Sequence, residues 1–123
     1  MKTLLIGGAP NTGKTNAVVM CAHYLVNNGF TVLDCQNYEG KKIQLPKIAT
    51  GSNPSTDFLA KLEGQDKNNK KISAVITSAS DTTGIIDGNF NYFQNQNCDI
   101  YISSVRDIGY ERKYLLSKFI ANA

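Results

Sequence analysis

The sequence predicts an α/β protein in which a mainly parallel sheet of about four strands lies between helices in a three-layer sandwich. Short apolar runs alternate with helical patterns along the chain, an order typical of strands that pair in parallel. A glycine-containing loop joins the first apolar run to the first helical pattern. At 123 residues and 41% hydrophobic composition, the chain is long enough for one core and too short for two ordinary domains. We therefore expect a single domain over residues 1–123.

The first part of the chain predicts a strand, a crossover helix and a second strand. The first strand covers Thr3 to Ile6, and Gly29 supplies a stop for the helix that follows the loop. The second strand covers residues 30–33 and ends at Asp34. One face of the predicted helix carries apolar residues at three- and four-residue spacing, namely Val18, Cys21, Ala22 and Leu25.

From residue 36 to about residue 71 the pattern becomes polar and rich in turn residues. A structureless loop of this length is unusual in a compact domain, so we expect an insertion or lid there. A short helix is expected to start after Ser55 or Thr56, with Asp57 in its first turn.

The last part of the chain returns to alternating elements. Residues 72–77 predict a third strand, and a helical region follows from about residue 82 to Phe93. Residues 98–105 predict a fourth strand, and residues 110–120 place apolar side chains at helical spacing.

The loop after the first strand reads G-x-x-x-x-G-K-T, which is the pattern of a phosphate-binding loop placed between a strand and a helix. Glycines let such a loop turn its backbone N–H groups toward phosphate oxygens, and the next helix directs its positive N-terminal end to the same anion. Lys14 would reach the β- and γ-phosphates, and the Thr15 hydroxyl would bind Mg²⁺. The predicted nucleotide-binding residues are Gly8, Ala9, Pro10, Asn11, Thr12, Gly13, Lys14, Thr15 and Asn16.

Polar residues at the carboxyl ends of the predicted strands extend this site, because ligands of open parallel sheets bind there. Asp34 is a candidate for the metal or for positioning an acceptor, with a turn-forming aspartate as the alternative. The third predicted strand is not followed directly by a carboxylate, so Asp81 or Ser78 would serve the metal in its place, or Mg²⁺ would rely on Thr15 and water; a helix N-cap is the alternative role for Asp81. Arg106 would neutralise charge in phosphoryl transfer. The predicted catalytic set is Lys14, Asp34, Asp81 and Arg106, and the metal set is Thr15, Asp34 and Asp81.

Residues 3–36 resemble the P-loop NTPase superfamily, and the later order of elements is similar to that of small nucleotide and metabolite kinases. The resemblance implies a P-loop NTPase-like fold, phosphate and Mg²⁺ binding by the loop, an acceptor facing Asp34, and a lid containing Arg106 and Arg112. The lysine that partitioning-type ATPases carry early in the loop is missing. The pattern also lacks the fifth strand that such kinases usually have after the last helix. Two possibilities follow: a minimal NTPase, or a fold that takes a strand from a second copy of the chain. No N-K-x-D guanine motif occurs, so ATP is favoured over GTP.

Composition excludes several other classes of protein. The net charge is only +3 and the charged residues are scattered along the chain, so we expect no nucleic-acid partner. The sequence contains no signal-peptide pattern and no apolar stretch of membrane-spanning length, so a cytoplasmic protein is expected. The three cysteines lack metal-ligand spacing, and His23, the single histidine, lies away from the loop.

Two functions therefore stay open. The leading hypothesis is an ATP-binding protein with Mg²⁺-dependent phosphoryl-transfer chemistry, either hydrolysis or transfer to a small anionic acceptor. The alternative is a nucleotide-dependent switch that turns over little or no ATP and engages a protein partner through residues 36–71.

Overall fold

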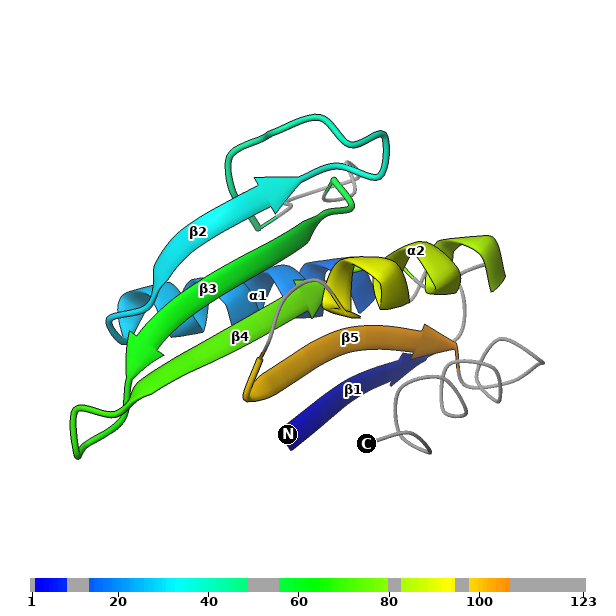
Figure 1. Ribbon diagram of the computed structural model, residues 1–123. Coiled ribbons are helices and arrows are strands. Elements are labelled where there is room, and N and C mark those ends of the chain that lie inside the picture. The colour runs from blue at the N-terminus through cyan, green and yellow to red at the C-terminus, as the bar shows by residue number, and fades with distance from the viewer. Residues whose placement is uncertain (1, 9–13, 49–55, 80–82, 95–97, 107–123) are drawn as a thin grey trace.

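The computed structural model describes residues 2–8, 14–48, 56–79, 83–94 and 98–106. Within these ranges a five-stranded sheet is accompanied by two helices (Figure 1). The strands are β1 (Lys2–Gly8), β2 (Thr31–Gln36), β3 (Leu59–Gln65), β4 (Lys71–Thr77) and β5 (Ile100–Arg106). The helices are α1 (Lys14–Asn27) and α2 (Thr83–Gln94).

The sheet is mixed, with the strand order β1-β5-β4-β3-β2. β5 pairs in parallel with both β1 and β4, whereas β3 pairs antiparallel with both β4 and β2. The predicted mainly parallel, four-stranded, P-loop NTPase-like sandwich is therefore wrong. The strand that overturns it is β3, which comes from the segment expected to be an insertion or lid.

A tight turn explains why β3 runs against β4. The Oδ1 atom of Asp66 accepts hydrogen bonds from the N–H groups of Asn68 at 2.8 Å and Lys70 at 2.9 Å. The N–H of Asp66 also donates to the carbonyl of Lys70, and Asn69 takes a positive φ of 61°. An Asp-anchored turn with a left-handed asparagine reverses the chain in a few residues, so the flanking strands must pair antiparallel.

The helix expected after Ser55 or Thr56 does not form. Phe58, Ala60 and Leu62 alternate along the chain and are all fully buried against the α1 side of the sheet. A period of two is that of a strand, and pairing with β2 and β4 on either side selects it over a helix.

The first helix ends as its sequence predicts. Gly29 has a φ of +96°, and its N–H donates to the carbonyl of Val26, while the N–H of Phe30 donates to the carbonyl of Leu25. This pair of hydrogen bonds is a Schellman motif, which favours glycine because the left-handed backbone carries no steric cost there. The chain is thereby turned from α1 directly into β2.

The two helices cover opposite faces of the sheet (Figure 1). Alternate residues of β4 and β5 point to opposite sides, as strand geometry requires. One core surrounds α1 and contains Ala74, Ile76 and Ile102. A second, smaller core lies under α2 and contains Val75 and Tyr101.

The pairing of β2 with β3 shifts its register between Val32 and Asp34. Beyond the shift, Cys35 is buried in the α1 core and Asp34 reaches α2 on the other face. The next segment of chain then turns back along β2, where the N–H of Ile43 donates to the carbonyl of Cys35. This contact covers part of the outer edge of the sheet.

The four predicted strands, the helix after the loop and the helical region near residues 82–93 are confirmed at β1, β2, β4, β5, α1 and α2. The helix predicted at residues 110–120 lies outside the described residues. Among the described helices, none has both the length and the apolar character needed to cross a membrane.

Candidate functional site

The residues that flank the phosphate loop, Gly8 and Lys14, lie at the edge of the sheet where its parallel strands end. β1 ends at Gly8 and α1 begins at Lys14, while Ala9, Pro10, Asn11, Thr12 and Gly13 lie outside the described residues. β4 and β5 also end at this edge. Because β3 runs in the opposite direction, its first residue, rather than its last, comes to the same edge.

Asp57, two residues before β3, joins the loop helix to the sheet at this edge. The Thr15 hydroxyl donates a hydrogen bond to Oδ1 of Asp57 over 3.0 Å. The Ser78 hydroxyl, just beyond β4, donates to the same oxygen over 2.9 Å. Three elements that are far apart in sequence therefore meet at one carboxylate.

The residue after Asp57 is held by hydrogen bonds to Ser78 that continue the β3–β4 pairing. The N–H of Ser78 donates to the carbonyl of Phe58 at 3.0 Å, and the N–H of Phe58 donates to Oγ of Ser78 at 2.7 Å. The Phe58 side chain is fully buried in the α1 core. This anchorage holds the carboxylate against the first turn of α1.

The Thr15 and Asp57 side chains suit a hard cation. Both offer oxygen atoms, the ligands that Mg²⁺ prefers, and Mg²⁺ in phosphate sites commonly uses one or two protein carboxylates together with phosphate and water. Since the Thr15 hydroxyl proton points at Asp57, the oxygen lone pairs of Thr15 point elsewhere. Within the described ranges no group of three or more His, Cys, Asp or Glu side chains gathers in a way that could hold a metal ion.

Several predicted site residues lie at the same edge. Gly8 and Arg106 are register partners on β1 and β5, so the structure brings the last strand residue before the loop beside the predicted arginine. Lys14 is the first residue of α1, and Asn16 lies in the same first turn as Thr15. Asp81, predicted for the metal, lies outside the described residues.

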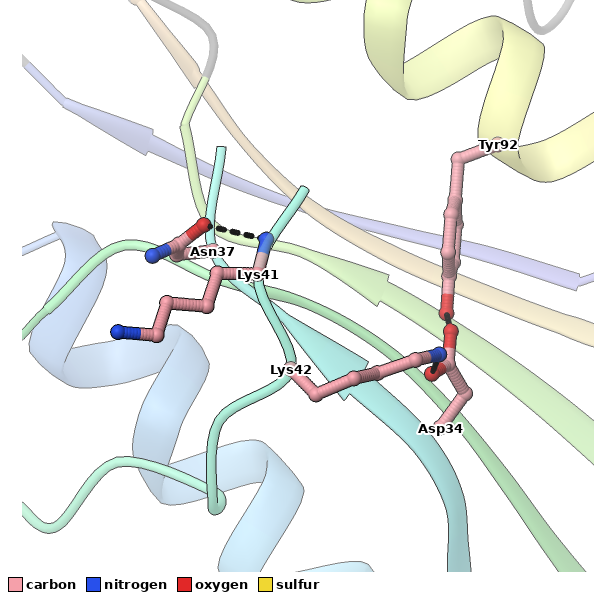
Figure 2. Close-up of polar contacts among 5 residues, drawn as sticks. All are labelled: Asp34, Asn37, Lys41, Lys42 and Tyr92. Carbon is pink, nitrogen blue, oxygen red and sulfur yellow. Dashed lines mark hydrogen bonds and ion pairs between the residues drawn. The ribbon is translucent and has the colours of Figure 1, made fainter. Parts of the chain in front are cut away.

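Asp34 lies elsewhere, between β2 and α2. Its carboxylate forms an ion pair with Lys42 and accepts a hydrogen bond from the Tyr92 hydroxyl at 2.8 Å (Figure 2). Burial alone would raise the pKa of Asp34, but the hydrogen bonds from Lys42 and Tyr92, with the charge of Lys42, bring that pKa below its ordinary value. Burial and the adjacent carboxylate raise the pKa of Tyr92 well above its usual range.

These contacts separate Asp34 from the phosphate-loop helix. Tyr92 belongs to α2, whereas Thr15 belongs to α1, and the two helices cover opposite faces of the sheet. The structure therefore brings Thr15 to Asp57 and does not bring Asp34 to either of them. Lys42 is engaged with Asp34, while the side chain of Lys41 points away from that carboxylate (Figure 2).

A second polar cluster lies beside the site and connects it to the segment after β2. The Tyr38 hydroxyl donates to Oδ1 of Asn89 at 2.8 Å and accepts from the N–H of Ala79 at 3.1 Å. The Asn89 side-chain amide donates to the carbonyl of Ala79 at 2.7 Å. Burial of the Tyr38 ring raises the pKa of its hydroxyl well above the usual range. Tyr38 thus ties the segment after β2 to the residue that follows Ser78.

Sequence reasoning missed Asp57 as a site residue. It was expected in the first turn of a helix, because Ser55 and Thr56 resemble a helix cap. The alternation of Phe58, Ala60 and Leu62, followed by the turn residues near Asp66, was the available signal for an antiparallel strand. With that strand recognised, an aspartate at its start would have been placed at the loop edge.

Comparison with known proteins found no match to a family model, to a curated protein or to a solved structure. What the site binds is therefore inferred from the chemistry of its own residues.

Proposed function

We propose that this chain binds ATP together with Mg²⁺ at the loop of residues 8–16 and performs phosphoryl transfer, either hydrolysis or transfer to a small acceptor. The observation that carries the proposal is the 3.0 Å hydrogen bond between Thr15 and Asp57. It places an acidic partner beside the residue that the loop motif assigns to the metal.

The supporting features are the ends of two strands and the start of a helix. Gly8 lies at the end of β1 and Arg106 at the end of β5, as register partners at the edge where the loop motif begins. α1 starts immediately after the loop, so its N-terminal N–H groups and partial positive charge face that edge. A triphosphate with its cation complements this combination of backbone donors, Lys14 and an oxygen-ligand pair.

Catalysis by such a site would consist of positioning and charge stabilisation. Bound Mg²⁺ would supply neutralisation of the phosphate charge, with Thr15 and Asp57 as the residues that hold it. Lys14 would contact the phosphates, and Arg106 would stabilise charge that develops as the γ-phosphoryl group leaves. ATP is preferred to GTP because the sequence has no guanine-recognition motif.

A nucleotide-dependent switch is the second candidate, and the contacts of Tyr38 favour it. Within residues 36–71, the segment expected to act as a switch, residues 59–65 form strand β3, and residues 37–48 are the longest described part outside the strands. This part is tied to the site edge through Tyr38 and Ala79. A change at the phosphates could therefore reach a surface segment that a protein partner contacts.

The test is a thermal-shift titration with Mg²⁺ plus ATP, GTP, ADP or a non-hydrolysable ATP analogue, with phosphate release measured on the same samples. A ligand at about 100 times its dissociation constant should add about 2.7 kcal/mol to the free energy of unfolding. Lys14→Ala should abolish most of this stabilisation. Lys67→Ala is the matched control, since Lys67 is an exposed lysine in the turn at the opposite edge of the sheet.

The outcomes separate the candidates. Stabilisation with phosphate release supports the enzyme, and stabilisation without release, in the presence of a panel of small acceptors, supports the switch. Equal stabilisation of wild type and the Lys14→Ala variant, or no stabilisation by any nucleotide, would contradict both.

A further inference from the structure

Ser78 is the residue through which the Asp57 carboxylate is attached to the sheet. Only 2% of its surface is exposed, and its Oγ lies between the N–H of Phe58 at 2.7 Å and Oδ1 of Asp57 at 2.9 Å. Its backbone is held as well, because its carbonyl accepts a hydrogen bond from the Ser104 hydroxyl at 2.7 Å. The side chain therefore has little freedom to turn.

The direction of each hydrogen bond defines what the Ser78 hydroxyl does. A hydroxyl has one proton to donate and two lone pairs with which to accept. The Phe58 N–H occupies a lone pair, and the proton goes to Asp57. Because the Phe58 N–H can only donate, it fixes the Ser78 hydroxyl as its acceptor and leaves the hydroxyl proton directed at the Asp57 carboxylate.

The two donors to Asp57 meet at one oxygen. Thr15 and Ser78 both donate to Oδ1, from α1 and from the end of β4 respectively. Two donors in different directions fix the plane of a carboxylate better than one, so its orientation toward Thr15 does not depend on Thr15 alone.

We propose that Ser78 is a positioning residue for the magnesium nucleotide: it holds the Asp57 carboxylate in the orientation that a cation at Thr15 requires. This inference rests on the proposed function, since it concerns how the same site distinguishes nucleotide with Mg²⁺ from nucleotide alone. Ser78 acts through Asp57 and is not assigned a contact with the nucleotide.

The readout is the magnesium dependence of nucleotide binding. For each variant the dissociation constant of ATP is measured by calorimetry in excess Mg²⁺ and again in EDTA, and the ratio of the EDTA value to the Mg²⁺ value is compared. A purely structural loss weakens both measurements together and cancels in the ratio. Loss of positioning lowers the ratio itself.

The variants are Ser78→Ala, Ser78→Thr, Asp57→Asn and the control Ser103→Ala. Ser103 is a fully buried serine on β5, and its hydroxyl contacts Thr77 rather than Asp57. We expect Ser78→Ala to lower the ratio by roughly tenfold, the effect of losing a hydrogen bond to a charged group. Asp57→Asn should lower it at least as much, because it removes the proposed magnesium ligand itself. Ser78→Thr keeps the hydroxyl and should retain most of the ratio, and Ser103→Ala should leave it unchanged.

Each failure has its own signature. A wild-type ratio near one would overturn the magnesium site of the proposed function, and the role of Ser78 with it. A high wild-type ratio that falls in Asp57→Asn but persists in Ser78→Ala would overturn the role of Ser78 alone. If Ser78→Ala does not fold, Ser78→Cys replaces it, because a thiol of similar shape is a weak donor and should lower the ratio in the same way.

Discussion

The Thr15 hydroxyl lies 3.0 Å from Oδ1 of Asp57 and donates a hydrogen bond to it across 42 positions of sequence. This contact joins the first turn of α1 to Asp57, two residues before β3. In the proposed function Asp57 is the carboxylate beside the metal, the role that the sequence pattern predicted for Asp34 and Asp81.

The Thr15–Asp57 contact should be measurable as a coupling free energy in the protein without ligand. Thr15→Val, Asp57→Asn and the double variant form a thermodynamic cycle, analysed from urea unfolding curves. The expected coupling is about 1 kcal/mol, the contribution of a typical hydrogen bond. Additive effects of the two single changes would show that the contact does not stabilise the fold.

The ion pair of Asp34 should make stability depend on pH in the acidic range. Its pKa in the folded chain is below the ordinary value of 3.8, so the unfolded chain takes up the proton first as the pH falls. The resulting stabilisation is present above pH 3.8 and is lost as the pH drops below it. Asp34→Asn should therefore lose stability at pH 7 and little at pH 3 in urea unfolding. Because Lys42 is largely exposed, the loss should stay below about 1 kcal/mol, and an equal loss at both pH values would contradict the assignment.

Gly64 on β3 should tolerate no side chain. A Cβ atom built there would lie 2.6 Å from the ring of Phe30, which packs directly over the strand. Gly64→Ala should lower the free energy of unfolding by about 1–3 kcal/mol, because the ring must move. Gly88→Ala is the matched control: a Cβ atom there meets nothing within 4 Å, and alanine in a helix should stabilise by up to about 1 kcal/mol. Opposite signs in thermal unfolding would confirm both environments.

The Tyr38 hydroxyl should contribute to stability because its partners are buried. Tyr38→Phe leaves the N–H of Ala79 and the side chain of Asn89 without that hydroxyl, which should cost about 1–3 kcal/mol. Tyr24→Phe, at a tyrosine that is 67% exposed, should change stability by less than about 0.5 kcal/mol. Similar small effects for both variants would show that the segment after β2 is not held through Tyr38.

Patterns among neighbouring residues predicted most of the individual helices and strands. The spacing of Val18, Ala22 and Leu25 and the stop at Gly29 predicted α1, because helix periodicity and capping depend on residues within a few positions of one another. The apolar runs of β1, β2, β4 and β5 were also evident, since buried strands are continuous apolar segments. The sequence by itself thus determined these elements and the place of the loop motif between β1 and α1.

The tertiary structure alone decided how those elements are assembled. The direction of β3 follows from the turn at Asp66, and its selection over a helix follows from pairing with strands on both sides. The register shift in β2 sends Asp34 to Tyr92 on the α2 face, and the reversed β3 brings Asp57 to Thr15 on the other. Such contacts join residues tens of positions apart, so they depend on strand order and register, which no local pattern in the chain encodes.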